Sequence, residues 1–325
     1  MSYANYRART CAKQKSAYES SLFAGAILEL PFSFYVGIDG GGTNCRARLY
    51  DAKGNVLVEG QSGPANVRLG FDVAWHNIIE ATNQCLVKNG LEADNFSRVA
   101  IGIGAAGVSS KQVCSAFQEC APNFGYINIS SDAHIACLAA FDGKDGGIII
   151  SGTGSCGYAI LGNKAHQIGG HGFELSDHGS SAALGRAALK ACLLAYDGIG
   201  PCTDLTNFLL SEFGGKPSDV VAWVKTAKPK DYGKFAPIIM DFADKGDEVA
   251  RNLAATAAQD LERIIYRLNQ LGAEKICMVG GMAQRLAQWL APWTKPILAA
   301  PKFDPTYGAY LLAKGANNGF NGKGK

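Results

Sequence analysis

Two glycine-rich turns, each placed directly after an apolar run, constrain the fold of this chain more than any other feature. The first is Gly40-Gly41-Gly42-Thr43, and the second is Ser151-Gly152-Thr153-Gly154-Ser155. Because glycine has no Cβ, backbone N–H groups in such a turn can lie directly against a ligand oxygen. A hairpin without a ligand is the alternative interpretation of one such turn. The second copy, roughly a hundred residues further on, predicts two similar halves that face each other across a cleft.

The first turn also carries side chains that suit a bound phosphate. Asp39 enters the turn with a carboxylate that can hold a hydrated magnesium ion, and Thr43 leaves it with a hydroxyl donor. The pattern therefore predicts a seat for phosphate oxygens.

Composition excludes several classes of function. Hydrophobic residues make up 47% and charged residues 18% of the 325 residues, which is typical of a globular protein of about two domains. The net charge of +3 is too small to favour nucleic acid as a partner, and no stripe of Lys and Arg with interleaved aromatic residues occurs. No apolar run reaches the roughly 18 residues that a membrane span needs. We therefore expect neither a nucleic-acid partner nor a membrane partner.

The cysteines indicate a reducing compartment. The chain has 10 cysteines, none forms a CxxC pair, and most lie in apolar settings. We interpret them as reduced thiols of a cytoplasmic protein. A zinc site at His166, His171 and His178 is a less favoured alternative, because these histidines lack cysteine partners at the spacings that zinc usually uses.

Residues 1–33 do not resemble the rest of the chain. Basic residues precede a short apolar piece at 22–30 that is interrupted by Glu29, and no cleavage site of small residues follows, so the segment is a poor secretory signal. We exclude this N-terminal extension from the fold, either as a disordered tail or as a start assigned too far upstream. The predicted domains are residues 34–130 together with a C-terminal helix at 304–316, and residues 131–303, with a tail at 317–325.

The hydrophobic pattern predicts an α/β fold with a mixed sheet. In the first half we predict three antiparallel strands between residues 34 and 60, then a helix at 71–88, a strand at 99–103, a helix at 111–120 and a strand at 126–129. In the second half we predict a helix at 133–141, strands beside the second turn, at 157–161 and at 165–168, a helix that ends near 195, a largely helical stretch at 203–271, a strand at 275–279 and a helix that ends at 290. A final helix at 305–313 is expected to cross back and cover the first half.

Other nucleotide-binding motifs are alternatives to the two turns. The GxxxxGK[ST] loop is absent. Gly102, Gly104 and Gly107 match GxGxxG after a strand and before a helix, as in a dinucleotide-binding site. No acidic residue stands about 20 positions further on to bind a ribose. We therefore interpret these glycines as places where strand and helix pack closely.

Four motifs together resemble those of the actin, Hsp70 and sugar kinase superfamily. Residues 39–43 are similar to its phosphate 1 motif, Asp132 to its connect motif, residues 151–155 to its phosphate 2 motif, and Val279-Gly280-Gly281 to its adenosine motif. Within the superfamily, the chain resembles the BadF/BadG/BcrA/BcrD ATPase family, the branch that holds N-acetylglucosamine kinases and activator ATPases. Further motifs over residues 34–315 resemble the bacterial glucosamine kinases: Gly152-Thr153-Gly154-Ser155-Cys156-Gly157, Ser176-Asp177, Tyr196-Asp197-Gly198-Ile199, Ala222-Trp223-Val224-Lys225-Thr226-Ala227 and Asp231-Tyr232-Gly233.

This resemblance implies a fold, cofactors and site residues. The implied fold is α/β, with two ribonuclease H-like (actin-like ATPase) domains, a mixed sheet in each, facing across a nucleotide cleft. The implied ATP-binding residues are Gly40, Gly41, Gly42, Thr43, Thr153, Gly154, Gly280 and Gly281, and Asp39 would order Mg2+ through water. The sugar would lie among Asn66, Asp132, Ser155, Cys156, Gly170, His171, Gly172 and Asp177.

Asp132 is the predicted catalytic base. It follows a predicted strand and opens a predicted helix, so a helix N-cap, worth about 1 kcal/mol, is its alternative role. A helix N-terminus favours an ionised carboxylate, and we expect a charged Asp132 that accepts the proton of the sugar hydroxyl. Asn66 and Asp177 also have alternative roles, as a turn former after Pro64 and as a helix N-cap.

The predicted function is ATP-dependent phosphorylation of the 6-hydroxyl of an amino sugar, with glucosamine as the first candidate and N-acetylglucosamine as the second. Phe173-Glu174 departs from the acetylated-sugar kinases, which suggests that Glu174 or Asp177 pairs with the ammonium of glucosamine.

An activator ATPase with an iron–sulfur cluster is disfavoured by the scattered cysteines. A sugar-responsive repressor would need an N-terminal DNA-binding helix pair, and residues 1–33 are too short for such a pair and lack its pattern. The sequence leaves the oligomeric state open, with a homodimer among the candidates.

Overall fold

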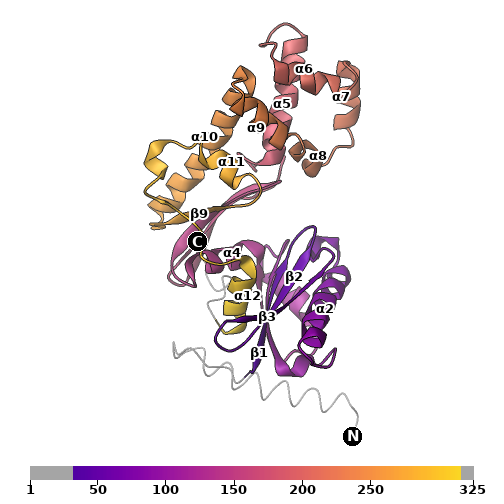
Figure 1. The fold of residues 1–325 in the computed structure, drawn as a ribbon, viewed down its shortest axis with the longest axis vertical. Helices are drawn as coiled ribbons and strands as arrows, with labels where there is room; N and C mark the ends of the chain where they lie inside the picture. The colour runs from indigo at the N-terminus through magenta and orange to yellow at the C-terminus, as the bar shows by residue number, and fades with distance from the viewer. Residues whose placement is uncertain (1–31, 316–325) are drawn as a thin grey trace.

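The structure, a computed structural model, describes residues 32–315 and contains two five-stranded mixed sheets. The strand order is β3-β2-β1-β4-β5 in the first sheet and β10-β9-β6-β7-β8 in the second. Figure 1 shows the first sheet with α2 and α12 in the lower half of the molecule, and the second sheet with α5 to α11 in the upper half. The predicted α/β architecture with one mixed sheet in each of two domains is confirmed.

The first sheet begins with an antiparallel meander. Its strands are β1 (Phe34–Gly40), β2 (Cys45–Tyr50), β3 (Val56–Ser62), β4 (Val99–Ala105) and β5 (Tyr126–Ser131), and its helices are α2 (Phe71–Lys88) and α3 (Lys111–Glu119). Because strand side chains alternate between faces, Val36 and Ile38 of β1 join the core beneath α2, whereas Tyr35 packs on the opposite face. One strand thus contributes to two cores.

The second half continues with a helix and a second meander. Its elements are α4 (Asp132–Phe141), β6 (Gly146–Ser151), β7 (Ser155–Leu161), β8 (Lys164–Gly169), α5 (Ser181–Tyr196), α6 (Asp204–Ser211), α7 (Pro217–Val224), α8 (Pro229–Gly233), α9 (Ala236–Asp244), α10 (Glu248–Gln270), β9 (Ile276–Val279), α11 (Ala283–Ala287) and β10 (Leu298–Ala299). The buried face of α10 carries Leu261, Ile265 and Leu268, and the helix packs on β6 and β7. Within residues 32–315, no helix combines the length and apolar character that crossing a membrane requires.

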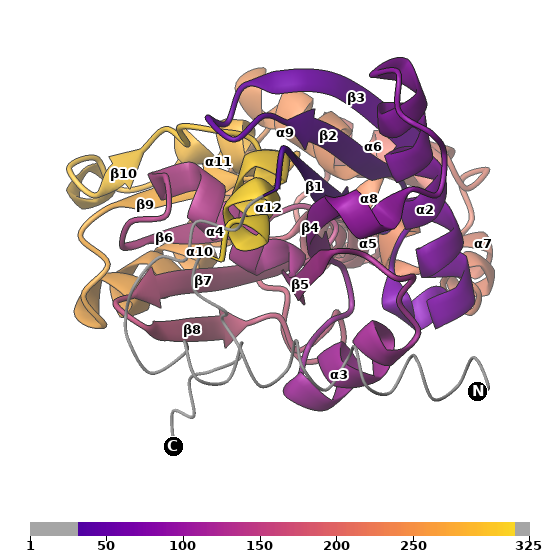
Figure 2. The ribbon, with the colours of Figure 1, turned by 90° about the horizontal axis from the view of Figure 1, so that it is seen from below.

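The final helix, α12 (Pro305–Ala313), crosses back to the first half as predicted. It packs against β1, β4 and α4, and Figure 2 shows it between β1 and α4. Three glycines allow this approach. A Cβ added at Gly37 would overlap the carbonyl of Thr306, one at Gly102 would overlap that of Ala309, and one at Gly308 would overlap that of Ile135 on α4. Helix α12 therefore lies in backbone contact with both the first sheet and the helix that opens the second half.

The glycines of the GxGxxG match serve packing. Gly102 lies against α12, and a Cβ added at Gly104 would overlap the side chain of Ile135. This outcome confirms close packing as the role of Gly102 and Gly104.

Some predicted boundaries were wrong. The helix expected to end at 290 ends at Ala287, and the two-residue strand β10 was not predicted. The N-terminal extension lies outside the described residues up to residue 31, and Phe32 packs against the core cluster of Tyr35. The tail at 317–325 lies outside the described residues, and the proposed domain limits stay a prediction.

Candidate active site

The first turn is open on its outer side and fastened at its base. The N–H of Gly41 donates to the carbonyl of Asn44 over 2.9 Å, which closes the turn between β1 and β2. Gly42 and Thr43 at its tip are exposed. The loop that carries Asn66 is held beside this turn, because the N–H of Ala65 donates to the Gly41 carbonyl over 3.1 Å. The turn thus presents its tip to solvent in a fixed position.

Asn66 caps the short 3₁₀ helix Val67–Leu69. Its Oδ1 accepts the N–H of Arg68 over 2.9 Å, and a Cβ added at Gly107 would lie 2.7 Å from this oxygen. A Cβ added at Gly42 would lie 3.9 Å from Asn66 Nδ2. The turn-forming role of Asn66 is therefore confirmed, and its amide nitrogen also lies beside the first turn. Its contact with sugar stays a prediction.

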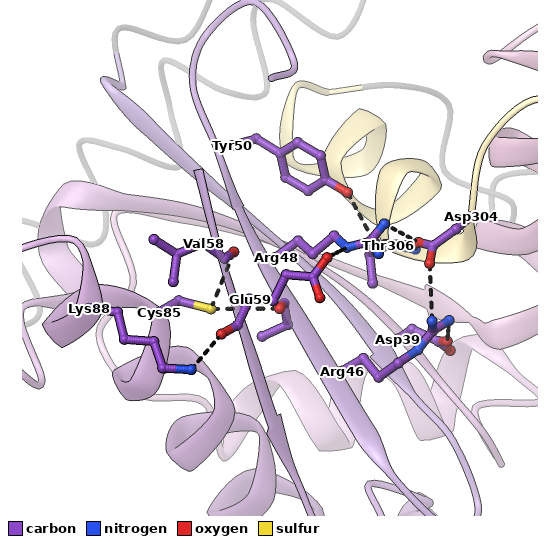
Figure 3. Close-up of polar contacts among 11 residues, drawn as sticks. Asp39, Arg46, Arg48, Tyr50, Val58, Glu59, Cys85, Lys88, Asp304 and Thr306 are labelled. Carbon is purple, nitrogen blue, oxygen red and sulfur yellow. Dashed lines mark hydrogen bonds and ion pairs between the residues drawn. The ribbon is translucent and has the colours of Figure 1, made fainter. Parts of the chain in front are cut away.

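Asp39 belongs to a chain of ion pairs that Figure 3 shows. Its Oδ2 lies 2.7 Å from Nη2 of Arg46, and Nη1 of the same arginine lies 3.0 Å from Oδ2 of Asp304, the N-cap residue of α12. Arg48 continues the chain, 3.2 Å from Asp304 and 2.6 Å from Glu59. Arg46 was missed by the sequence analysis, although it lies two residues after Asn44, which closes the turn. It holds Asp39 in place and brings a positive charge close to the predicted phosphate seat.

The residues around Asp39 fit a magnesium ion that is held mainly by nucleotide phosphates and water. Magnesium in kinases commonly uses only one or two protein carboxylates and keeps several waters. Within residues 32–315, no group of three or more His, Cys, Asp or Glu side chains is arranged to hold a metal by itself. Asp39, which is paired with Arg46, is the carboxylate that would order such an ion through water, and this role stays a prediction.

Asp132 is the first residue of α4, but it is not the cap of that helix. The N-cap is Ser131, whose hydroxyl accepts the N–H of His134 over 3.2 Å. The carboxylate of Asp132 accepts the N–H of Ala133 over 2.8 Å. The predicted capping alternative was wrong because the preceding serine already fills the N-cap position. The carboxylate of Asp132 is therefore not needed to cap the N-terminus of α4.

The electrostatic environment of Asp132 differs from the expected one. Burial raises the pKa of this carboxyl above its ordinary value, and the nearby charge of Asp39 raises it further. The N–H of Ala133 and the charge of Arg68 act in the opposite direction. The expectation considered the helix N-terminus alone, whereas desolvation outweighs that contribution and raises the pKa, and the charge state of Asp132 at neutral pH stays a prediction.

Replacing Asp132 by asparagine is expected to raise stability at pH 7. The folded-state pKa of Asp132 lies above that of the unfolded chain, about 3.9. Ionisation therefore opposes folding above the raised pKa, and this penalty vanishes below the unfolded value. The neutral amide avoids the penalty, so Asp132→Asn should have a higher Tm at pH 7, and the gain should disappear as the pH falls towards about 4. Thermal unfolding across a pH series measures it, and equal Tm values at pH 7 would contradict the raised pKa.

The second turn carries Asp177 against its backbone. The carboxylate of Asp177 accepts the N–H of Ser155 and would lie 2.9 Å from a Cβ added at Gly154. Burial raises the pKa of Asp177, while the Ser155 N–H and the nearby His178 and His171 act to lower it. Asp177 has φ of 60°, in the left-handed region that most residues avoid. The N-cap of α5 is Ser180, so the predicted capping alternative for Asp177 was also wrong.

Cys156 lies near both Asp132 and Asp177. Burial, followed by the charges of these two carboxyls, raises the pKa of the Cys156 thiol to about 12, so the thiol is protonated at neutral pH. A Cβ added at Gly170 would lie 3.0 Å from the Cβ of Cys156. Gly170 and Gly172 have φ of 73° and 97°, which glycine adopts without strain. The structure thus brings Asp132, Cys156, Asp177 and Gly170 together.

Other predicted sugar residues are placed differently. The hydroxyl of Ser155 donates its proton to the carbonyl of His178 over 2.6 Å, and its contact with sugar stays a prediction. His171 is exposed. The side chain of Glu174 is 84% exposed and lies 3.9 Å from Arg186, which covers the ring of Phe173. Of the two carboxylates considered for the sugar ammonium, Asp177 is therefore the one that lies beside Cys156.

The predicted adenosine turn lies directly on the base of the second turn. Gly280 has φ of 103°, and a Cβ added there would overlap the carbonyl of Ser151. The same carbonyl accepts the N–H of Met282 over 3.0 Å. Gly281 is exposed, and no heavy atom lies within 4 Å of a Cβ added there. The two glycines thus continue the surface that the second turn begins.

Comparison with known proteins decides the family. The sequence model of the BadF/BadG/BcrA/BcrD ATPase family matches residues 36–313, which is most of the chain. The chain belongs to this family. The resemblance inferred from the four motifs is therefore confirmed.

Relatives of this family member include two named sugar kinases. It is 40% identical over 281 residues to the glucosamine kinase GspK of Vibrio cholerae, covering 86% of this chain and 96% of that protein. It is 30% identical over 310 residues to the N-acetyl-D-glucosamine kinase of Dictyostelium discoideum, covering 86% of this chain and 97% of that protein. A solved structure from Chromobacterium violaceum, provisionally named an N-acetylglucosamine kinase, superposes with a TM-score of 0.80 at 31% identity, covering 87% of this chain and 99% of that one.

Proposed function

We propose that this family member transfers the γ-phosphoryl group of ATP to the 6-hydroxyl of glucosamine, giving glucosamine 6-phosphate and ADP. The observation that carries the proposal is the position of Asp132, which lies close enough to Asp39 of the first turn for the charge of Asp39 to raise its pKa, and close enough to Cys156, after the second turn, to raise the pKa of that thiol. The nearness of the predicted base to residues of both predicted phosphate turns supports the proposal. N-acetylglucosamine is the second candidate acceptor, because relatives with either substrate in their name match the chain.

The proposed reaction uses backbone turns and one carboxylate. Gly40 to Thr43 bind the phosphates from one side and Thr153 and Gly154 from the other, so the γ-phosphorus faces the acceptor. Asp132 accepts the proton of the 6-hydroxyl while the new O–P bond forms, and the bond between the β–γ bridging oxygen and the γ-phosphorus breaks to release ADP. Bound magnesium, ordered through water by Asp39, would neutralise phosphate charge. The raised pKa of Asp132 supports this role, because a general base works best with a pKa nearer the working pH.

Asp177 is the proposed contact for the amino group. Its carboxylate lies beside Cys156 and Gly154, and a carboxylate can form an ion pair with an ammonium, whereas a neutral acetamide carries no charge to pair with it. All nine cysteines within residues 32–315 are free thiols, which fits the proposed cytoplasmic location.

ADP release measured with glucosamine, N-acetylglucosamine and glucose side by side tests the proposal. We expect the highest kcat/KM with glucosamine, because only this sugar carries the ammonium that Asp177 can bind. Phosphate release without sugar serves as the control for ATP hydrolysis. A higher kcat/KM with N-acetylglucosamine would show that this sugar, and not glucosamine, is the preferred acceptor. ADP release that no sugar increases would overturn the kinase proposal.

A further inference from the structure

Ser151 contacts three segments of the proposed site, although within the phosphate 2 motif it was given no ligand contact of its own. It ends β6, begins the second turn and is fully buried. Its hydroxyl donates to the carbonyl of Gly179 over 3.1 Å. Its own carbonyl accepts the N–H of Met282 over 3.0 Å and lies against Gly280. One residue thus contacts the phosphate turn, the adenosine turn and the segment that follows Asp177.

Residues 177–182, which we call the sugar segment, are fastened to the second turn along their length. Further hydrogen bonds run in the same place: Ser155 N–H to the Asp177 carboxylate, Ser155 hydroxyl to His178 carbonyl over 2.6 Å, Ser181 N–H to Gly152 carbonyl over 2.8 Å, and Ala182 N–H to Thr153 carbonyl over 3.4 Å. On the other side the segment lies against α10, where a Cβ added at Gly179 would be 2.7 Å from the Ala257 carbonyl. The sugar segment and the second turn therefore form one body.

The backbone at Asp177 depends on these bonds. A non-glycine residue with positive φ is disfavoured and persists only where the surrounding structure holds it. Asp177 has φ of 60°, and the hydroxyls of Ser155 and Ser151 hold the carbonyls of the next two residues, His178 and Gly179. The two hydroxyls thus fix the direction in which the Asp177 carboxylate points.

We propose that Ser151 is a positioning residue that makes the sugar site and the ATP site interdependent. The inference rests on the proposed function, in which Asp177 binds the sugar and Thr153 and Gly154 bind phosphates. Because one body carries both groups, a movement that places Asp177 on the sugar also places the second turn and the adenosine turn on ATP. Each ligand therefore raises the affinity of the other. Loss of the Ser151 hydroxyl removes the hydrogen bond to the Gly179 carbonyl. The sugar segment with Asp177 and the second turn with Thr153 and Gly154 can then move separately.

The test measures binding and needs no turnover. The affinity for the ATP analogue AMPPNP is determined by calorimetry without sugar and with saturating glucosamine, and again with N-acetylglucosamine. In the parent, the bound sugar should tighten AMPPNP by about 5-fold or more. In Ser151→Ala this ratio should fall by about 3-fold, as expected for one lost hydrogen bond of ordinary strength. Thr294→Val is the matched control, because it removes another buried hydroxyl that donates to a backbone carbonyl, that of Ala291 over 2.8 Å. It should keep the parent ratio.

The outcomes separate the inference from the proposed function. If Ser151 had only a structural role, its replacement by alanine would lower Tm but leave unchanged the ratio of AMPPNP affinities with and without sugar. A parent-like ratio in Ser151→Ala therefore overturns the inference. A parent that binds a sugar without any change in AMPPNP affinity also overturns it and leaves the kinase proposal standing. A parent that binds neither sugar overturns the proposed function, on which the inference rests. If Ser151→Ala does not fold, Ser155→Ala removes the neighbouring tether at His178, and an unchanged ratio there counts against the inference in the same way.

Discussion

Replacing Asp132 by asparagine is expected to lower kcat by roughly 100-fold or more, the usual effect of losing a general base. The amide keeps the shape of the side chain and can still accept the N–H of Ala133, so α4 should begin in the same way. It cannot accept a proton from the sugar hydroxyl. Because Asp132 is predicted to act on the acceptor rather than on the nucleotide, ATP affinity should be unchanged. Steady-state kinetics and AMPPNP calorimetry on the same preparation measure the two effects.

The matched control is Asp72→Asn. Asp72 also lies in the first turn of a helix, α2, but its side chain is exposed and no site role is proposed for it. Its turnover should equal that of the parent. If Asp132→Asn also keeps the parent turnover, Asp132 has no part in the mechanism, and another group would have to accept the proton.

Gly102→Ala is expected to lower the free energy of unfolding by about 3 kcal/mol, at the upper end of the cost of overpacking a core. A Cβ at this position in β4 would overlap the carbonyl of Ala309 and lie 2.7 Å from the N atom of Ala313. Both atoms belong to backbone, which cannot turn aside as a flexible side chain can. Helix α12 would have to move away from the sheet, and the contacts of the buried Tyr310 with Tyr35 and Tyr50 would weaken. Denaturant unfolding followed by far-UV circular dichroism measures the loss.

Gly281→Ala provides the comparison for this substitution. No heavy atom lies within 4 Å of a Cβ added at Gly281, and its φ is outside the left-handed region. We expect its unfolding free energy to stay within about 0.5 kcal/mol of the parent, as for ordinary surface substitutions. A Gly102→Ala protein as stable as the parent would show that α12 does not require a glycine beneath it.

Local sequence patterns predicted much of the fold because the long elements have strong periodicity and clear ends. The helices at 71–88 and 305–313 have the predicted bounds, and each is followed within two residues by a glycine. Strand β10 could not be predicted, because a two-residue strand has no alternation to detect. Its identity as a strand depends on pairing with β9, which only the folded chain provides.

The site was predictable where its residues form a local motif and unpredictable where their roles depend on distant partners. The two turns and Asp132 stand out in the sequence. The role of Arg46 depends on Asp304, 258 positions away, and that of Ser151 depends on Gly179. The direction of the Asp132 pKa shift could not be predicted for the same reason, because the helix terminus is visible in the sequence whereas burial and the approach of Asp39 arise on folding.

The position of α12 has a consequence for how the protein is made. The face of the first sheet that carries Tyr35, Tyr50 and Ala100 is covered by residues that the ribosome synthesises only after the whole of 132–304. At typical translation speeds this interval lasts roughly ten to thirty seconds. During that time the nascent first half presents an unfinished apolar surface, and exposed surface of this kind promotes aggregation until α12 covers it.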